Sequence, residues 1–286
     1  MSLTIKNILY PTDFSDNAKN ALPFALELAK KTGAMVHIMH SIEEPYDFAP
    51  MVEDIKKNVT RKVKQLYEEM LADIKSKKEY ESVNIKTHIF EGRTVHSLLS
   101  VIEDYKMDLV VMGTQGRSAL ERLFFGSTTS EVVQQAMVPV LTIPEKARHS
   151  EFKHILFTTD YGPEDLKALK FTTEYAKLYD ADIKVIHVTK KLDQKADLLF
   201  RGFKDLVSNE IKYKKMEFKH IESEGLLEGV TKEVEKKDVS MIVMVRYQHI
   251  FSIIGKKHSK EMSQSTKVPL MVLPGKPESS KGNVII

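Results

Sequence analysis

Cysteine is absent from this chain of 286 residues. Its absence excludes disulfides, thiolate metal sites and cysteine nucleophiles, and it leaves the compartment undecided. No window approaches the ~20 consecutive apolar residues of a membrane-spanning helix. The N-terminus leads almost directly into a strand-like run at residues 5–10, without a long apolar stretch before a cleavage site. We therefore expect a cytoplasmic protein with no membrane partner.

A strong excess of charge of one sign is also missing. The 43 lysines and arginines and the 40 aspartates and glutamates give a formal net charge of +3. Proteins that bind a nucleic-acid backbone usually carry a strongly basic surface, so no nucleic-acid partner is expected. Hydrophobic residues make up 42% of the chain, enough for packed cores, and its length suits two domains of about 100–200 residues each.

The sequence contains two copies of one pattern. Residues 6–13 read Lys-Asn-Ile-Leu-Tyr-Pro-Thr-Asp, and residues 153–160 read Lys-His-Ile-Leu-Phe-Thr-Thr-Asp. Asp13 and Asp160 are therefore 160 − 13 = 147 positions apart, and later segments keep the same order in both copies. Similarity that stays in register over most of the chain indicates a duplication.

Short apolar runs alternate with helical patterns inside each copy, which predicts βαβ units, a parallel sheet and right-handed crossovers. The first domain is predicted at residues 1–146 and the second at 151–275, followed by a disordered tail at 276–286. In the first copy we expect strands at 5–10, 35–40, 85–90, 108–112 and 139–143, and helices near 16–31, 51–78, 94–105 and 128–136.

A glycine-rich segment follows the fourth predicted strand of the first copy. Two residues separate its first glycine from its second, nine more residues precede a Gly-Ser pair, and a predicted helix follows. In open α/β sheets, ligands bind beyond the carboxyl ends of the strands. Glycines there permit a positive φ and let a polyphosphate approach the backbone, and the N-terminus of a helix attracts anions. Thr128 and Glu131 also have the spacing of a capping box, so Ser127 and Thr128 are caps, phosphate ligands or both.

With this motif, the chain resembles the ATP-binding universal stress proteins, and the resemblance extends over both copies. It implies an α/β fold: two tandem, doubly wound, five-stranded parallel sheets of the Rossmann-like, adenine-nucleotide-hydrolase-like type. It also implies that the last strands of the copies, 140–143 and 270–273, pair antiparallel in an internal pseudo-dimer. A homodimer through edge strands or domain faces is a further expectation.

The resemblance also assigns a ligand, ATP, with Mg²⁺ as its possible companion. The residues expected to cradle the phosphates and the ribose are Gly113, Gly116, Gly126 and Ser127, and Thr128 is a further expected phosphate contact.

Three more positions transfer from the family less directly. Asp13, at the end of the first strand, is expected beside the nucleotide, where it is also a candidate to help hold Mg²⁺. No second carboxylate is placed to complete a dedicated metal site. The backbone of Ser41 matches the position that meets adenine, although the family usually has an aliphatic residue there. Arg117 is able to reach a phosphate, but a lone arginine is more often a surface residue.

The second copy departs from the motif. Val245 stands where the first copy has Gly113, the next glycine has no counterpart, and Gly255 leads into Lys256-Lys257-His258. A β-branched valine resists a positive φ and puts methyl groups where phosphates would approach. We predict that the second copy does not bind ATP in the family's manner.

No catalytic motif accompanies the glycine pattern, because the sequence has no Walker loop, nucleophile elbow or zinc-protease helix. His40 and His187 end matching strands, so a shared structural role is favoured over a ligand role. The sequence predicts a nucleotide-dependent regulatory or protective factor of a stress response. A slow ATPase or nucleotide hydrolase that uses the same pocket is the alternative, and a module in which nucleotide is mainly structural is the third reading.

Overall fold

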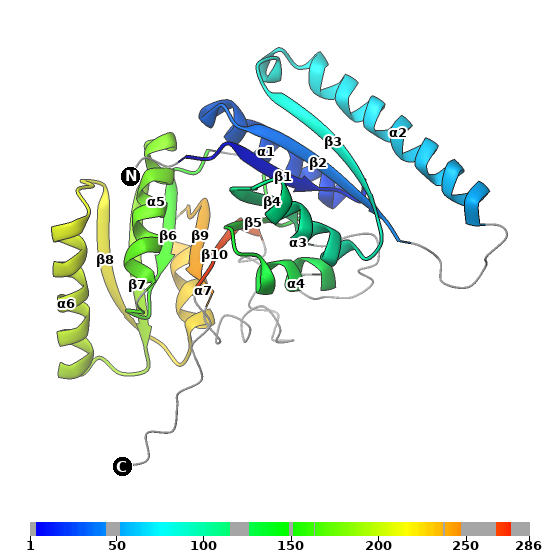
Figure 1. Cartoon of the computed structure of the whole chain (residues 1–286). Helices are drawn as coiled ribbons and strands as arrows, with labels where there is room; N and C mark the ends of the chain where they lie inside the picture. Colours follow the sequence, from blue (N-terminus) through cyan, green and yellow to red (C-terminus); the bar gives the residue numbers. More distant parts are fainter. Residues whose placement is uncertain are drawn as a thin grey trace. The chain divides into compact units, whose positions relative to one another are not determined.

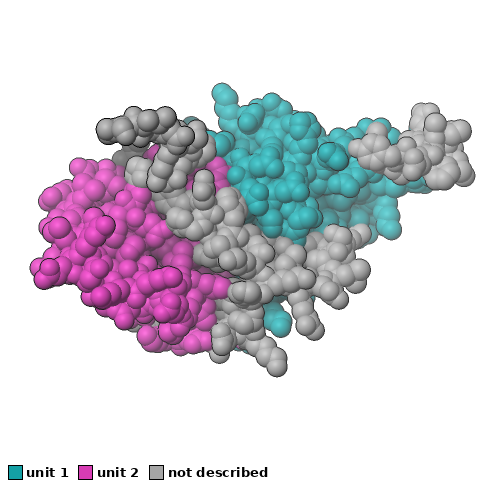
Figure 2. All heavy atoms as spheres, turned by 90° about the horizontal axis from the view of Figure 1, so that it is seen from below, with its two compact units in different colours: residues 1–149 teal, residues 150–286 magenta. Residues whose placement is uncertain are grey.

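The computed structural model describes residues 4–43, 52–114, 126–148, 151–162, 164–236, 238–246 and 267–275. The chain divides into two compact units, residues 1–149 and 150–286, which are taken one at a time below (Figure 1 and Figure 2). Within the described segments, no helix has the length and apolar character needed to cross a membrane.

Unit 1 is built on a five-stranded parallel sheet in the order β3-β2-β1-β4-β5. Its strands are short and largely apolar, as expected for a sheet covered on both faces. Their bounds are β1 (Asn7–Pro11), β2 (Met35–Ile42), β3 (Asn84–Glu91), β4 (Leu109–Gly113) and β5 (Val140–Ile143).

The helices of unit 1 connect these strands and cover the sheet. Helix α1 packs against β4 and β1, while α3 and α4 pack against each other, as right-handed crossovers require when the strand order reverses. The helices are α1 (Asp16–Thr32), α2 (Val52–Ser76), α3 (Thr94–Asp104) and α4 (Ser127–Gln135), with a short 3-10 turn, η1 (Lys78–Tyr80), before β3. Every strand and helix predicted for the first copy begins and ends within two residues of the observed element.

Unit 2 repeats this topology with the parallel order β8-β7-β6-β9-β10. The predicted α/β fold with two doubly wound sheets is therefore confirmed, while the pairing of the two copies in a pseudo-dimer stays a prediction. The elements are β6 (His154–Thr158), α5 (Asp165–Tyr179), β7 (Asp182–Thr189), α6 (Gln194–Glu210), β8 (Met216–Glu222), α7 (Leu226–Lys236), β9 (Met241–Val245) and β10 (Leu270–Leu273). The predicted tail at 276–286 lies outside the described residues.

Candidate functional site

The strand order of unit 1 reverses between β1 and β4, so the loops that leave their carboxyl ends run in opposite directions. Such a switch point opens a crevice for a ligand in doubly wound sheets. Ile8 of β1 pairs with Leu109 of β4, and Val110 of β4 pairs with Val140 of β5. The candidate site is therefore built from the β1–α1 loop, the end of β4 and the start of α4.

Asp13 lies in the loop between β1 and α1, where its side chain shapes the turn. Its Oδ1 accepts a hydrogen bond of 3.0 Å from the backbone N–H of Ser15. Ser15 in turn is the N-cap of α1, and its Oγ accepts from the N–H of Ala18 at 3.2 Å. Side-chain oxygens in these two roles are a recurrent way to begin a helix. Asp13 is thus held at the switch point, and its place beside a nucleotide stays a prediction.

A bulky residue in the left-handed region follows the aspartate in both units. Phe14 and Tyr161 have φ 60°, a conformation that is rare for large side chains. Each is fixed by the same bond, since its N–H donates to the Oγ1 of the threonine two residues earlier, Thr12 or Thr159, at 3.0 Å. The duplicated sequence therefore reproduces a strained loop at the same edge of both sheets.

The matching histidines have the shared structural role that was predicted. His40 donates from Nδ1 to the carbonyl oxygen of Thr12 at 2.8 Å, and His187 makes the same bond to Thr159 at 2.7 Å. A carbonyl oxygen only accepts, so Nδ1 carries the proton in each ring. Both histidines tie the second strand of their sheet to the loop that follows the first strand.

Gly113 ends β4 and needs to be a glycine for a reason that the sequence does not reveal. A Cβ at this position would lie 3.0 Å from the carbonyl oxygen of Asn17 in α1. The expectation of a positive φ is wrong here, because Gly33 and Gly92 are the glycines with positive φ among the described residues. Gly113 instead permits the close approach of α1 to β4.

The N-terminus of α4 is fastened next to Gly113. Gly126 is its N-cap and donates its N–H to the carbonyl oxygen of Thr114 at 2.6 Å. The hydroxyl of Thr129, which is buried, donates to the carbonyl oxygen of Gly113 at 3.0 Å. These two bonds hold the first turn of α4 against the end of β4. Neither Thr114 nor Thr129 was singled out from the sequence, although Thr114 follows Gly113 directly and Thr129 ends the Gly-Ser-Thr-Thr run.

Ser127 and Thr128 are the first two residues inside α4 rather than its caps. The predicted capping box around Thr128 is therefore wrong, because the helix begins two residues earlier than that box requires. The side chain of Ser127 is exposed and that of Thr128 is half-buried. Backbone N–H groups in the first turn of a helix have no carbonyl partner within the helix and carry its positive dipole end, so this turn offers an anion site.

Ser41 lies near the end of β2 with its side chain already engaged. Its Oγ donates to the carbonyl oxygen of Gly92 at 3.0 Å, which ties β2 to the turn after β3. The structure brings Asp13, Gly113 and Gly126 to the same sheet edge as Ser41. Two predicted site residues, Gly116 and Arg117, lie outside the described residues.

The corresponding edge of unit 2 is organised by an acidic residue that sequence reasoning missed. Asp165, which is fully buried, accepts from the hydroxyl of Thr159 at 2.6 Å and from the N–H groups of Asp160 and Gly162 at 3.0 and 3.1 Å. Val245 ends β9 in the interior. The basic run after Gly255 lies outside the part of the chain that the structure describes.

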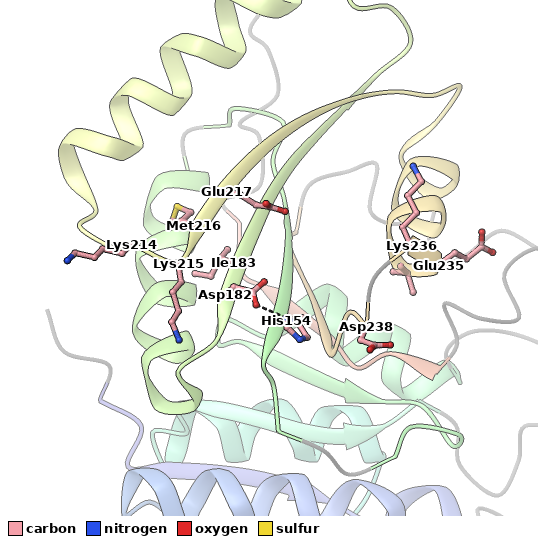
Figure 3. A pocket seen from close by; sticks show the side chains of 11 residues that line it. His154, Asp182, Ile183, Lys214, Lys215, Met216, Glu217, Glu235, Lys236 and Asp238 are labelled. Carbon is pink, nitrogen blue, oxygen red and sulfur yellow. Dashed lines mark hydrogen bonds and ion pairs between the residues drawn. The ribbon is translucent and has the colours of Figure 1, made fainter.

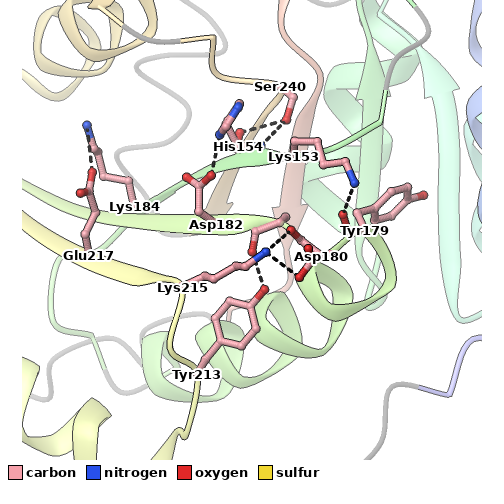
Figure 4. Close-up of polar contacts among 11 residues, drawn as sticks. Lys153, His154, Tyr179, Asp180, Asp182, Lys184, Tyr213, Lys215, Glu217 and Ser240 are labelled. Carbon is pink, nitrogen blue, oxygen red and sulfur yellow. Dashed lines mark hydrogen bonds and ion pairs between the residues drawn. The ribbon is translucent and has the colours of Figure 1, made fainter.

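A polar cavity of about 850 Å³ opens at the opposite, amino-terminal edge of the sheet in unit 2 (Figure 3). Several of its charged side chains form ion pairs within the chain (Figure 4). His154 Nδ1 lies 2.5 Å from Asp182 Oδ1, and Lys215 Nζ lies 2.6 Å from Asp180 Oδ1. Among the described residues, no group of three acidic or histidine side chains is placed to hold a metal ion. This cavity belongs to unit 2, whereas the glycine motif belongs to unit 1, and it is not the candidate site.

Comparisons with known proteins agree with this architecture. The model of the universal stress protein family matches residues 4–144. A universal stress protein of Methanocaldococcus jannaschii is 32% identical over 139 residues, which cover 48% of this chain and 81% of that relative. One from Thermus aquaticus is 31% identical over 140 residues, or 48% and 98% of the two chains. The crystal structure of a universal stress protein from Archaeoglobus fulgidus covers 94% of this chain and 96% of its own, with a TM-score of 0.71 and 21% identity.

Proposed function

The chain belongs to the universal stress protein family, and we propose that unit 1 binds ATP at the switch point between β1 and β4. The phosphates would meet the end of β4 and the first turn of α4, and Asp13 would lie beside the nucleotide. Mg²⁺ would enter with the phosphates, which usually supply several of its ligands. Nucleotide occupancy would then regulate a response to stress.

One observation carries this proposal. The hydroxyl of Thr129 and the N–H of Gly126 bind the carbonyl oxygens at the end of β4, at 3.0 and 2.6 Å. These two bonds fix the N-terminus of α4 beside Gly113, the glycine that ends β4, at the point where the strand order reverses. The N–H of Gly126 is used in this anchoring, and the N–H groups of the first turn that follows are thereby held in place to meet a phosphate.

Binding is favoured over hydrolysis because Asp13, the acidic residue expected beside the nucleotide, already has a structural role. Asp13 accepts the N–H of Ser15 at 3.0 Å and so forms part of the turn into α1. A hydrolase would need a group free to activate water. Single-turnover hydrolysis of ATP above background, abolished in Asp13→Ala, would favour the enzyme instead.

Unit 2 would not bind ATP in the same way. Val245 replaces the glycine at the strand end, and the loop after β6 is tied down by Asp165 through three hydrogen bonds of 2.6–3.1 Å. Both features support a single nucleotide site per chain.

The test is a calorimetric titration of the full chain with ATP and Mg²⁺, after bound nucleotide has been assayed by denaturation. Ser127→Glu puts a carboxylate on the first turn of α4, where it suits the helix dipole but repels phosphate. We expect one site per chain, with affinity reduced at least 10-fold in Ser127→Glu. Ser82→Glu, an equal charge change in the exposed turn before β3, is the matched control and should bind as wild type does. Two sites, or full affinity in Ser127→Glu, would contradict the proposal.

A further inference from the structure

Helix α6 of unit 2 is held to its own sheet by few side chains. Over its 17 residues only Phe203 and Val207 are buried, whereas α5, with 15 residues, buries eight. The ring of Phe200 adds contacts with His220 and Phe218 of β8, at centroid distances of 4.9 and 6.5 Å. Figure 1 shows α6 beside β8. The aromatic and aliphatic side chains on one face of α6 thus account for its attachment to the sheet of unit 2.

The neighbouring face of α6 carries three leucines that are exposed to water. Leu198, Leu199 and Leu206 are 71%, 50% and 45% exposed. At 100° per residue, all three lie within about 60° of the direction of Gly202 around the helix axis. Exposed apolar side chains gathered in one place, in contrast to scattered ones, mark an interaction surface. We call these four residues the α6 face.

Gly202 has no packing reason within the described part of the chain. A Cβ built on it would meet nothing within 4 Å. Glycine inside a helix destabilises the helix relative to alanine, so its presence at an open position needs another cause. A glycine in the centre of an apolar face lets the backbone of a second helix approach closely.

We propose that the α6 face binds the α6 face of a second copy of this chain, antiparallel, across a two-fold axis at Gly202. Leu198 and Leu206 are spaced symmetrically about that glycine, since 202 − 198 and 206 − 202 are both 4. A two-fold axis there brings Leu198 against the partner subunit's Leu206, and the reverse contact forms at the same time. Such mutual contacts are what an isologous interface requires.

The charges on the same face select the antiparallel arrangement. Lys195 lies seven residues before Gly202 and Asp205 lies three residues after it. Across the two-fold axis, the partner's Asp205 comes within four residues of Lys195 along the helix, about 6 Å, which a lysine side chain can span. A parallel arrangement would instead put Lys195 against the partner's Lys195, a repulsive pair.

Cross-linking tests this arrangement in the full chain, because the protein has no cysteine of its own. The variants Leu198→Cys and Leu206→Cys are made separately. Each variant by itself, and an equimolar mixture of the two, is then treated with a short bis-maleimide. We expect a covalent dimer mainly in the mixture, since equal positions on antiparallel helices are about 12 Å apart. Cross-linking that is equally strong in the separate samples, or absent from all of them, would overturn the proposal.

Gly202→Ala separates association from folding. The alanine should raise the urea midpoint of the chain, because it favours the helix, yet it should weaken self-association in sedimentation experiments at least 10-fold. Leu198→Glu should weaken association as well, whereas Met137→Glu, which changes a residue of unit 1 that is 65% exposed, is the matched control and should not. Wild-type protein that stays monomeric up to about 200 µM, or association unchanged in Gly202→Ala, would overturn the proposal.

Discussion

His37 shows how a single buried residue makes the stability of unit 1 depend on pH. Its side chain is 4% exposed, and its Nδ1 lies 2.9 Å from Nε2 of His88. Its Nε2 donates to Oδ1 of Asn7 at 3.3 Å. Burial lowers the pKa of His37 to about 4, with further lowering from His88 and Lys86. The ring is therefore neutral in the folded protein well below its ordinary pKa.

Lowering the pH from 7 to 5 should destabilise the protein through this residue. In that window the unfolded chain binds a proton on His37 and the folded chain does not, so the free energy of unfolding falls, by about 2 kcal/mol. His37→Gln should lose less stability over the same range than wild type, as measured by urea denaturation at both pH values. His96→Gln, at an exposed position of α3, is the control. Equal losses in wild type and His37→Gln would contradict this account.

Among the helices, α1 and α5 occupy matching positions but fit their sheets differently. The offset of 147 would start α5 at residue 163, whereas it begins at Asp165. Helix α1 packs more closely on β4 than α5 packs on β9. Gly113 accommodates that close packing in unit 1, and unit 2 has Val245 at the corresponding place.

Gly113→Val should therefore destabilise unit 1 even without nucleotide. The first carbon of the new side chain would lie 3.0 Å from the carbonyl oxygen of Asn17, a backbone atom that moves only if α1 moves. We expect a loss of about 1–3 kcal/mol in the free energy of unfolding, with a smaller loss in Gly113→Ala. Denaturation in urea measures both. A valine variant as stable as wild type would show that α1 has room to shift.

The sequence predicts the elements well because each carries a local signal. Buried parallel strands appear as short apolar runs and α2 as an apolar stripe, so their bounds are found within two residues. The details of the site depend on contacts between distant segments. The approach of Asn17 to Gly113 and the three bonds to Asp165 arise only when helix and strand are packed. The cap of α4 was misplaced because Thr128 and Glu131 imitate a capping box, while a glycine with no side chain is the cap.

At the scale of the whole molecule, a nucleotide site in unit 1 should make that unit respond to ATP and leave unit 2 unchanged. ATP at about 100 times its dissociation constant would stabilise unit 1 by about 2.7 kcal/mol. Hydrogen exchange measured by mass spectrometry should then slow in β1, β4 and α4 and stay unchanged in β6, β9 and α7. Equal slowing in both units would indicate either a second site or strong coupling between the units.

The strand order also has a consequence for synthesis. Strand β1 pairs with β2 soon after both are made. Its other neighbour, β4, comes much later in the chain, because Leu109, the partner of Ile8, is 109 − 8 = 101 residues further on. At about 5–20 residues per second, a ribosome needs roughly 5–20 s to deliver it. During that interval one edge of the central strand of unit 1 is open to any chain that it meets. The nascent protein is therefore most exposed to mispairing on the ribosome, before the glycine motif has been translated.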